Sequence, residues 1–281
     1  MPFLKRSGQP AIYYEVDDYT DPWKRAPTIV LQHGFARSHR VWYSWVPYLS
    51  RHYKVVRSDL RGMGLSSRDF DLKTGISLDA YFSDFNALLD ELGGGPVHYC
   101  GESLGGILGM AYAAEHPQRL RTLSIVSSPV HLHGRDQQAS SYGHASREEA
   151  LRKMGARGWA EASNAGRRFA RDADPGMMNW FVDEMGDSDI EVLIATYAFA
   201  SSYDAMPYLP RIKTPMLGLY PTDGPIAGDE QIELLQTNVP HARVVRLPTQ
   251  YHAINTSHPA TCARQVLHFA AQHDGIVCHE S

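Results

Sequence analysis

The chain has 281 residues, of which 43% are hydrophobic, and a formal net charge of −4 at pH 7. This length and apolar content allow a large buried core in one domain or two. The negative balance argues against a nucleic-acid-binding protein, which usually carries a basic face. No stretch approaches the roughly 18 uninterrupted apolar residues of a membrane span. We therefore expect a protein that does not bind nucleic acid and does not span a membrane.

The three cysteines, Cys100, Cys262 and Cys278, are sparse, odd in number and lack the spacing of a metal site. Such usage suits a reducing compartment better than a disulfide framework. The first residues also lack the layout of a secretion signal. We expect a cytoplasmic protein without metal or organic cofactor, since no Walker P-loop or dinucleotide-binding GxGxxG is present. Assembly into a homo-oligomer stays open.

Apolar runs bounded by turn residues alternate along the chain with segments of helical periodicity. This alternation is typical of a parallel sheet covered by helices. Strands are predicted at 11–16, 28–32, 53–58, 97–100, 123–126, 215–220 and 243–247. Helices are predicted at 78–92, 105–115 and about 259–272.

Between about residues 131 and 209 the sequence is polar and helix-prone, without strong strand signals. The simplest interpretation is a single α/β core, formed by residues 1–130 and 210–281. A helical insertion at 131–209 interrupts this core, and we interpret it as a cap or lid.

The most informative motif is Gly101-Glu102-Ser103-Leu104-Gly105, which joins a predicted strand to a predicted helix. A nucleophile on such a sharp turn has a strained backbone, and the close approach of strand and helix favours glycine on both sides. The turn lifts the serine hydroxyl clear of the sheet, at the N-terminus of the helix. We therefore predict that Ser103 is a nucleophile. The alternative is a glycine-rich turn with an incidental serine.

A second motif, Gln32-His33-Gly34-Phe35, follows the predicted strand at 28–32. An oxyanion hole needs two backbone N–H groups directed at the carbonyl oxygen that gains charge. We predict that Phe35 and Leu104 supply them. His33 is expected to shape this loop rather than to contact substrate.

These two motifs, together with Ser58-Asp59-Leu60-Arg61-Gly62-Met63-Gly64-Leu65-Ser66, resemble the α/β-hydrolase superfamily. More closely, they resemble its small capped enzymes, which include enol-lactonases, carboxylesterases and C–C bond hydrolases. The resemblance implies a mostly parallel eight-stranded sheet flanked by helices, with a helical cap insertion. It also implies the chain order serine, acid, histidine. Asp59, Arg61 and Ser66 are interpreted as structural.

His252 fits the place of the histidine, because it follows the last predicted strand and precedes the C-terminal helix. A neutral imidazole can accept the serine proton near neutral pH. The family usually has glycine before this histidine, where this chain has Tyr251. That phenol could line the substrate pocket.

The acid is the least certain member of the predicted triad. The family typically shows Gly, two variable residues, Asp and Pro after the strand, whereas this chain has Pro221-Thr222-Asp223-Gly224-Pro225. Asp223 is preferred, one place early, and Asp229 is the alternative. A buried acid would hold the imidazole tautomer and stabilise the imidazolium.

Within the insertion, an apolar and aromatic set has helical spacing, which favours a core role over a pocket role. Members that face Ser103, with Trp180 and Tyr197 as candidates, would line an acyl or alcohol pocket. The whole set comprises Met177, Met178, Trp180, Phe181, Tyr197, Phe199 and Tyr203. Arg37, His39 and Arg40 could meet a substrate carboxylate, although a solvated basic edge is preferred.

The predicted function is hydrolysis of a carboxylic ester or lactone through an acyl-enzyme. Amide, carbamate or C–C bond hydrolysis by the same residues is an alternative. Lyase chemistry on a Ser–His pair is another, and so is a non-enzymatic ligand-binding protein on the same fold.

Overall fold

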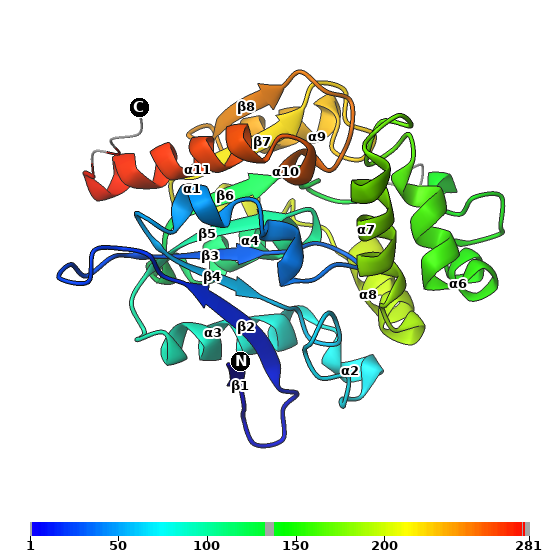
Figure 1. Ribbon diagram of the computed structural model, residues 1–281, viewed down its shortest axis with the longest axis horizontal. Helices are drawn as coiled ribbons and strands as arrows, with labels where there is room; N and C mark the ends of the chain where they lie inside the picture. The colour runs from blue at the N-terminus through cyan, green and yellow to red at the C-terminus, as the bar shows by residue number, and fades with distance from the viewer. Residues whose placement is uncertain (1, 133–137, 277, 279–281) are drawn as a thin grey trace.

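A twisted eight-stranded sheet forms the centre of the structure (Figure 1). The structure is a computed structural model that describes residues 2–132, 138–276 and 278. The strands are β1 (Phe3–Leu4), β2 (Ile12–Asp17), β3 (Thr28–Gln32), β4 (Lys54–Ser58), β5 (Val97–Glu102), β6 (Leu120–Val126), β7 (Met216–Pro221) and β8 (Arg243–Leu247). Their order in the sheet is β1-β2-β4-β3-β5-β6-β7-β8.

The pairings β1–β2 and β2–β4 are antiparallel, and all the others are parallel. The carboxyl ends of β3 to β8 therefore lie along one edge of the sheet. Ligands of open α/β sheets bind at this edge. The predicted mostly parallel eight-stranded sheet is confirmed.

Helices cover both faces of the sheet, so its central strands are buried on both sides. Along β3, Ile29 and Leu31 pack in one core and Val30 packs in another, as the alternation of side chains requires. The first core includes residues of α1 (Val46–Leu49) and α11 (Pro259–Asp274), which lie together in Figure 1. The second includes residues of α3 (Leu78–Glu91), α4 (Leu104–Glu115) and α9 (Asp229–Asn238).

Within the described part of the predicted insertion between β6 and β7, three long helices gather at one end of the molecule (Figure 1). They are α6 (Arg147–Asn164), α7 (Pro175–Gly186) and α8 (Ile190–Ser202). Each begins with a side-chain cap on a backbone amide, from Ser146, Asp174 and Asp189 respectively. The division into a core and a cap at 131–209 stays a prediction.

Short elements complete the connections. They are α2 (Leu72–Gly75), α10 (Ile254–Ser257) and three turns of 3-10 helix, η1 (His39–Trp42), η2 (Pro117–Arg119) and η3 (Leu209–Arg211). The sequence did not predict β1, because two residues are too few to show a period. The predicted strand at 123–126 also lacks the first three residues of β6, where exposed Arg121 interrupts the apolar run.

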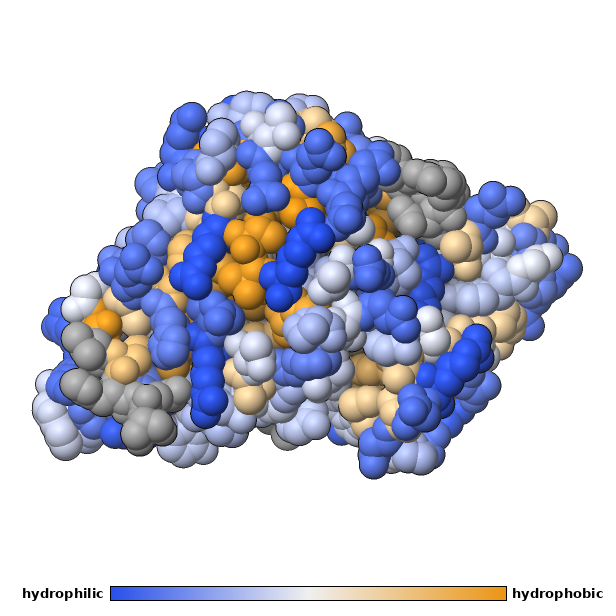
Figure 2. Space-filling model, turned by 90° about the horizontal axis from the view of Figure 1, so that it is seen from above, coloured by the Kyte–Doolittle hydropathy of each residue, from blue (hydrophilic) through white to orange (hydrophobic). Residues whose placement is uncertain are grey.

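The face shown in Figure 2 is largely hydrophilic, and its apolar side chains gather in a patch near the centre. Within the described part of the chain, no helix has both the length and the apolarity needed to cross a membrane.

Candidate active site

Ser103 occupies the turn between β5 and α4, where the sequence motif predicts it. Its backbone has φ 52° and ψ −115°, a conformation that L-residues rarely adopt. The surroundings hold this turn in place, since the Ser103 amide donates to the carbonyl of Val126 at 2.9 Å. A Cβ on Gly105 would lie 2.5 Å from the carbonyl oxygen of Gln32. Strand and helix therefore approach closely enough to require glycine at this point.

His252 lies beside Ser103 although the two are 149 positions apart in sequence. Its Nε2 is 3.3 Å from the Ser103 Oγ. The loop between α6 and α7 holds the histidine, because the His252 amide donates to the carbonyl of Arg167 at 3.1 Å and the next amide donates to Arg168 at 3.1 Å. The predicted serine and histidine are thus brought within hydrogen-bond reach of each other.

The amides of Phe35 and Leu104 are available for a ligand. Both residues line the cavity that contains Ser103 and His252. Among the described residues, neither amide donates a hydrogen bond to another group. Leu104 is the first residue of α4, so its N–H belongs to the unpaired end of the helix. Two free donors beside a serine hydroxyl form an arrangement that can hold an oxyanion.

The cavity around Ser103 is small and largely closed. Its volume is about 50 Å³. The pockets that bury drug-sized ligands are commonly about 300–1,000 Å³. A substrate larger than a few heavy atoms therefore requires side chains of the cavity wall to move aside.

A buried ion pair forms part of the cavity wall. Arg37 Nη1 lies 2.7 Å from Oε1 of Glu102, and both side chains are at most 2% exposed. The same carboxylate oxygen lies 3.7 Å from Nε2 of His252. Glu102 thus approaches the ring nitrogen that also faces Ser103.

No carboxylate is bonded to the other ring nitrogen of His252. Within the described residues, His252 Nδ1 is buried without a hydrogen-bond partner. Asp223 is exposed on the loop after β7. The backbone of that loop meets the β8 loop, where the Thr222 amide donates to Leu247 and Thr249. The structure therefore does not join the predicted acid Asp223 to His252.

The alternative acid, Asp229, is also engaged elsewhere. It begins α9, is 70% exposed and pairs with Arg246 at 2.5 Å. The geometry thus supports a Ser103–His252 pair and provides no hydrogen-bonded third member.

The electrostatic surroundings of His252 are strongly positive. Burial lowers its pKa well below the usual 6.5, and the charges of Arg37, Arg168 and Arg167 lower it further. The imidazole is therefore neutral across the physiological range. In that form Nε2 can accept a proton from a serine hydroxyl.

Of the three predicted pocket residues, only Tyr197 lines the cavity with Ser103. Trp180 lies on the outer side of α7, with its ring centroid 5.5 Å from that of Tyr43. Tyr251 is half-buried and its hydroxyl accepts a hydrogen bond from Gln250 at 3.2 Å. The predictions for Trp180 and Tyr251 are not supported, because helical spacing and sequence neighbourhood do not fix the direction in which a side chain points.

The sequence favoured a solvated basic edge made of Arg37, His39 and Arg40. This prediction is wrong for Arg37 and His39. Arg37 is buried in the cavity wall, and His39 is buried with its Nδ1 3.0 Å from both carboxylate oxygens of Asp59. Arg40 is exposed but pairs with Glu184.

Other motif residues serve the architecture, as the sequence predicts. His33 Nε2 accepts from the amide of Leu60 at 3.0 Å, and burial lowers the pKa of His33 to about 4. Its Nδ1 lies 2.8 Å from the carbonyl of Gly34 and so helps to shape the oxyanion loop. Arg61 forms a buried pair with Asp84 at 2.7 Å. These contacts position the loops without reaching the cavity.

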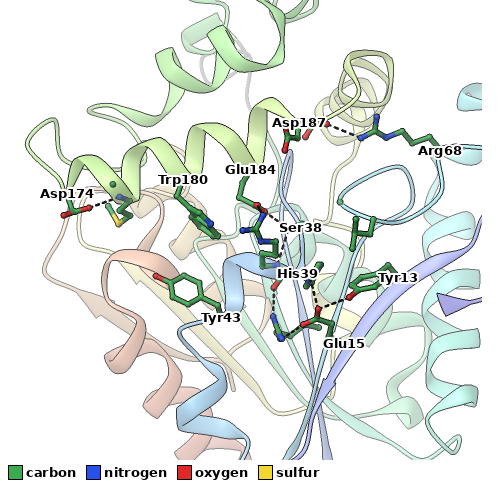
Figure 3. A pocket seen from close by; sticks show the side chains of 17 residues that line it. Tyr13, Glu15, Ser38, His39, Tyr43, Arg68, Asp174, Trp180, Glu184 and Asp187 are labelled. Atoms are coloured by element: carbon green, nitrogen blue, oxygen red, sulfur yellow. Dashed lines mark hydrogen bonds and ion pairs between the residues drawn. The ribbon is translucent and has the colours of Figure 1, made fainter. Parts of the chain in front are cut away.

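A larger hollow of about 890 Å³ lies outside the cavity, between α7 and the β2 side of the sheet (Figure 3). Several of its charged side chains are paired with one another. Glu184 binds Ser38 and Arg40, and Glu15 pairs with Arg57 at 2.5 Å. Ser103 and His252 do not line this hollow. Its size alone gives no reason to place the chemistry there.

The sequence did not identify three charged residues of the cavity wall, which are Glu102, Arg147 and Arg168. Glu102 stands inside the recognised motif, at a position that the motif leaves variable. Arg147 and Arg168 belong to the insertion, which has no motif, so no local signal marked them. Within the described ranges, no group of three or more His, Cys, Asp or Glu side chains is arranged to hold a metal ion.

Comparison with known proteins identifies the fold family of the chain. Residues 27–259 match the family model described as the alpha/beta hydrolase fold. A proposed carbamate hydrolase, RutD, of Stutzerimonas stutzeri is 27% identical over 258 residues, which is 88% of this chain and 91% of that protein. The pimeloyl-[acyl-carrier protein] methyl ester esterase of Aeromonas hydrophila is 27% identical over 250 residues, 87% of this chain and 96% of that protein.

Among solved structures, the enol-lactonase from Burkholderia xenovorans LB400 superposes with a TM-score of 0.84. It is 24% identical and the match covers 95% of this chain and 99% of that one. The likeness at this identity concerns the fold. Because the family model covers most of the chain, this protein belongs to the alpha/beta hydrolase fold family.

Proposed function

We propose that the protein is a serine hydrolase that cleaves a carboxylic ester or lactone through an acyl-enzyme. The observation that carries the proposal is the 3.3 Å separation between Ser103 Oγ and His252 Nε2 at a strained strand-to-helix turn. A serine hydroxyl is a weak nucleophile by itself, and a base within hydrogen-bond reach activates it.

In the first half-reaction, Ser103 Oγ attacks the carbonyl carbon while His252 Nε2 takes the hydroxyl proton. The oxygen of the tetrahedral intermediate gains negative charge, and the amides of Phe35 and Leu104 stabilise it. When the intermediate collapses, the bond to the alkoxy group breaks and His252 returns the proton to the leaving alcohol. A water molecule, deprotonated by His252, then attacks the acyl carbon. The bond to Ser103 Oγ breaks, His252 returns the proton to this oxygen, and the acid is released.

The proposed mechanism operates without a carboxylate on Nδ1 of His252. In serine hydrolases such a group orients the imidazole and stabilises the imidazolium that forms during attack. Here the backbone of His252 is held by its bond to Arg167, and Glu102 at 3.7 Å is the nearby negative charge. Because Arg37 already pairs with Glu102, we expect slow turnover relative to enzymes with a complete triad.

A fluorophosphonate probe tests the nucleophile directly, because it forms a covalent bond with an activated serine. Native protein should be labelled at Ser103, and Ser103→Ala should not. Ser83→Ala is the matched control, since Ser83 is an exposed serine on α3 that does not line the cavity. Equal labelling of wild type and Ser103→Ala would overturn the proposal.

Carbamate cleavage is a second candidate, favoured by the similarity to the RutD protein. The same attack would apply, with an amine and carbon dioxide as the final products of the carbamoyl half. Parallel assays of matched aryl acetates and aryl carbamates distinguish the two. A burst of released phenol followed by slower turnover would support a covalent intermediate over lyase chemistry.

A further inference from the structure

We propose that the arginines of the cap form a carboxylate-binding subsite next to Ser103, so that the substrate is an ester or lactone bearing a free carboxylate. This inference rests on the proposed function, and it concerns the substrate class of the same site. Its evidence comes from Arg168 and Arg147, which neither the motifs nor the relatives identify.

Arg168 is the central residue of this subsite. Its side chain lines the cavity that contains Ser103 and is only 6% exposed. Nη1 donates to the carbonyl of Ser163 at 3.1 Å, whereas Nε is buried without a hydrogen-bond partner. Among the described residues, no carboxylate forms an ion pair with Arg168. A buried guanidinium with an unused donor has the properties of a site that a ligand completes.

Arg147 extends the positive region from the other side of the cavity. Its guanidinium carbon lies 4.0 Å from the ring centroid of Tyr197 and 4.5 Å from that of Trp159. These aromatic faces hold the cation in place without neutralising its charge. Nε of Arg147 is also buried without a partner.

A second, smaller chamber continues the first and is lined by three arginines. Its volume is about 30 Å³, and it shares Arg147, Arg168 and Tyr197 with the cavity of Ser103. Arg167 lines the far side, where it donates to Ser140 at 3.1 Å. The two chambers therefore adjoin each other; we call them together the path, with the serine hydroxyl in one chamber and guanidinium groups around both.

The charges of this path do not balance. Among the residues that the structure describes, four arginines line the two chambers against one carboxylate, Glu102, and Arg37 already pairs with it. The pKa of Arg168 is lowered to about 9. Burial is the larger cause and repulsion from Arg37 is the next. Unpaired buried charge is unfavourable, so an anion that enters this path gains both Coulomb energy and hydrogen bonds.

A carboxylate suits this subsite because a planar guanidinium binds it with two parallel hydrogen bonds. The serine and the arginines line a common cavity, so the carboxylate and the scissile carbonyl must lie a few bonds apart in one small molecule. Half-esters of short dicarboxylic acids and acetyl esters of short hydroxy acids have this form. The half-esters carry the charge on the acyl side of the ester bond, and the acetyl esters carry it on the alcohol side.

The test compares kcat/KM for each of these anionic esters with that for its neutral, size-matched amide analogue. Wild type should prefer the carboxylate of at least one pair by roughly 10–100-fold, as expected for a charge-assisted bond. Arg168→Gln should remove most of that preference, measured as the ratio of kcat/KM for the anionic ester to that for its neutral analogue at one pH. Arg211→Gln is the matched control, because Arg211 pairs with Glu115 on the surface. Equal rates on both members of both pairs would overturn the subsite.

Binding to Ser103→Ala separates the subsite from the chemistry. Glutarate should bind this variant, and glutaramide should bind much more weakly, whether or not the wild type turns over any ester. Binding of glutarate without hydrolysis would reject the proposed function and keep the subsite. Hydrolysis of neutral esters without binding of glutarate would reject the subsite alone. Arg168→Lys covers the case in which Arg168→Gln does not fold, and it should keep part of the affinity.

Discussion

Glu102 and His252 are in contact on the side of the imidazole that faces Ser103, with Oε1 of Glu102 3.7 Å from Nε2 of His252. In a serine triad the carboxylate lies on the opposite ring nitrogen, where it orients the base. The buried carboxylate of this site therefore has another function. It balances Arg37, at 2.7 Å, and limits the positive charge next to the base.

The Arg37–Glu102 pair leads to a prediction about stability. Glu102→Gln should lower the free energy of unfolding by about 3–5 kcal/mol, because it leaves a buried arginine without its partner. Arg37→Gln should have a similar effect for the opposite reason. The measurement is urea unfolding, followed by fluorescence. The double variant should lose clearly less than the sum of the two single losses, and additive losses would show that the pair is not coupled.

The low pKa of His252 predicts the pH dependence of the reaction. A base must be neutral to accept a proton, and burial together with Arg37, Arg168 and Arg167 keeps the pKa of His252 well below 6.5. As pH falls through 6.5, kcat/KM on a neutral aryl ester should therefore stay constant, and it should decline only at lower pH.

Removing one of these positive charges should shift the decline. In Arg168→Gln the imidazolium is less strongly repelled, so the pKa of His252 rises and the decline in kcat/KM begins at higher pH. Arg211→Gln should leave the profile unchanged. Profiles recorded between about pH 4 and 9 decide the question. A wild-type decline centred at 6.5 or above would contradict the positive surroundings of His252.

Asp223 is predicted to matter little. Its side chain is exposed and no hydrogen bond joins it to His252. Asp223→Asn should therefore change kcat by no more than about threefold, whereas loss of a true triad acid costs on the order of 10⁴-fold. His252→Ala is the reference for loss of the base. A loss of about 10³-fold or more in Asp223→Asn, at unchanged KM, would restore Asp223 as the acid.

Much of the fold could be predicted because its signals are local. The strands at 28–32 and 243–247 have the predicted bounds, since short apolar runs end at clear turn residues. Ser103 was found for the same reason, because the motif and its strand–turn–helix context are contiguous. The position of His252 could be predicted from its order in the chain, after the last strand and before the last helix.

The remaining features of the site depend on contacts between distant segments. Arg168 reaches the cavity because the cap segment pairs its backbone with residues 252 and 253, which no local pattern encodes. Trp180 and Tyr197 both have helical spacing in aromatic surroundings, yet they point to different hollows. Whether a loop acid reaches an imidazole depends on a shift of one residue, and sequence alone does not settle such a shift.

The last prediction concerns Gly105 in the turn that carries Ser103. It tests whether glycine is required there because β3 and α4 pack closely. Gly105 lies where β3 meets α4, and an added Cβ would be 2.5 Å from the Gln32 carbonyl oxygen and 2.8 Å from that of His33. Gly105→Ala should push α4 away from β3, displace the Leu104 amide and lower kcat by about 10²–10³-fold, as for loss of an oxyanion donor. Gly95→Ala is the matched control, because a Cβ there meets nothing within 4 Å. Circular dichroism checks that both variants fold, and full activity in folded Gly105→Ala would show that the Leu104 amide does not stabilise the oxyanion.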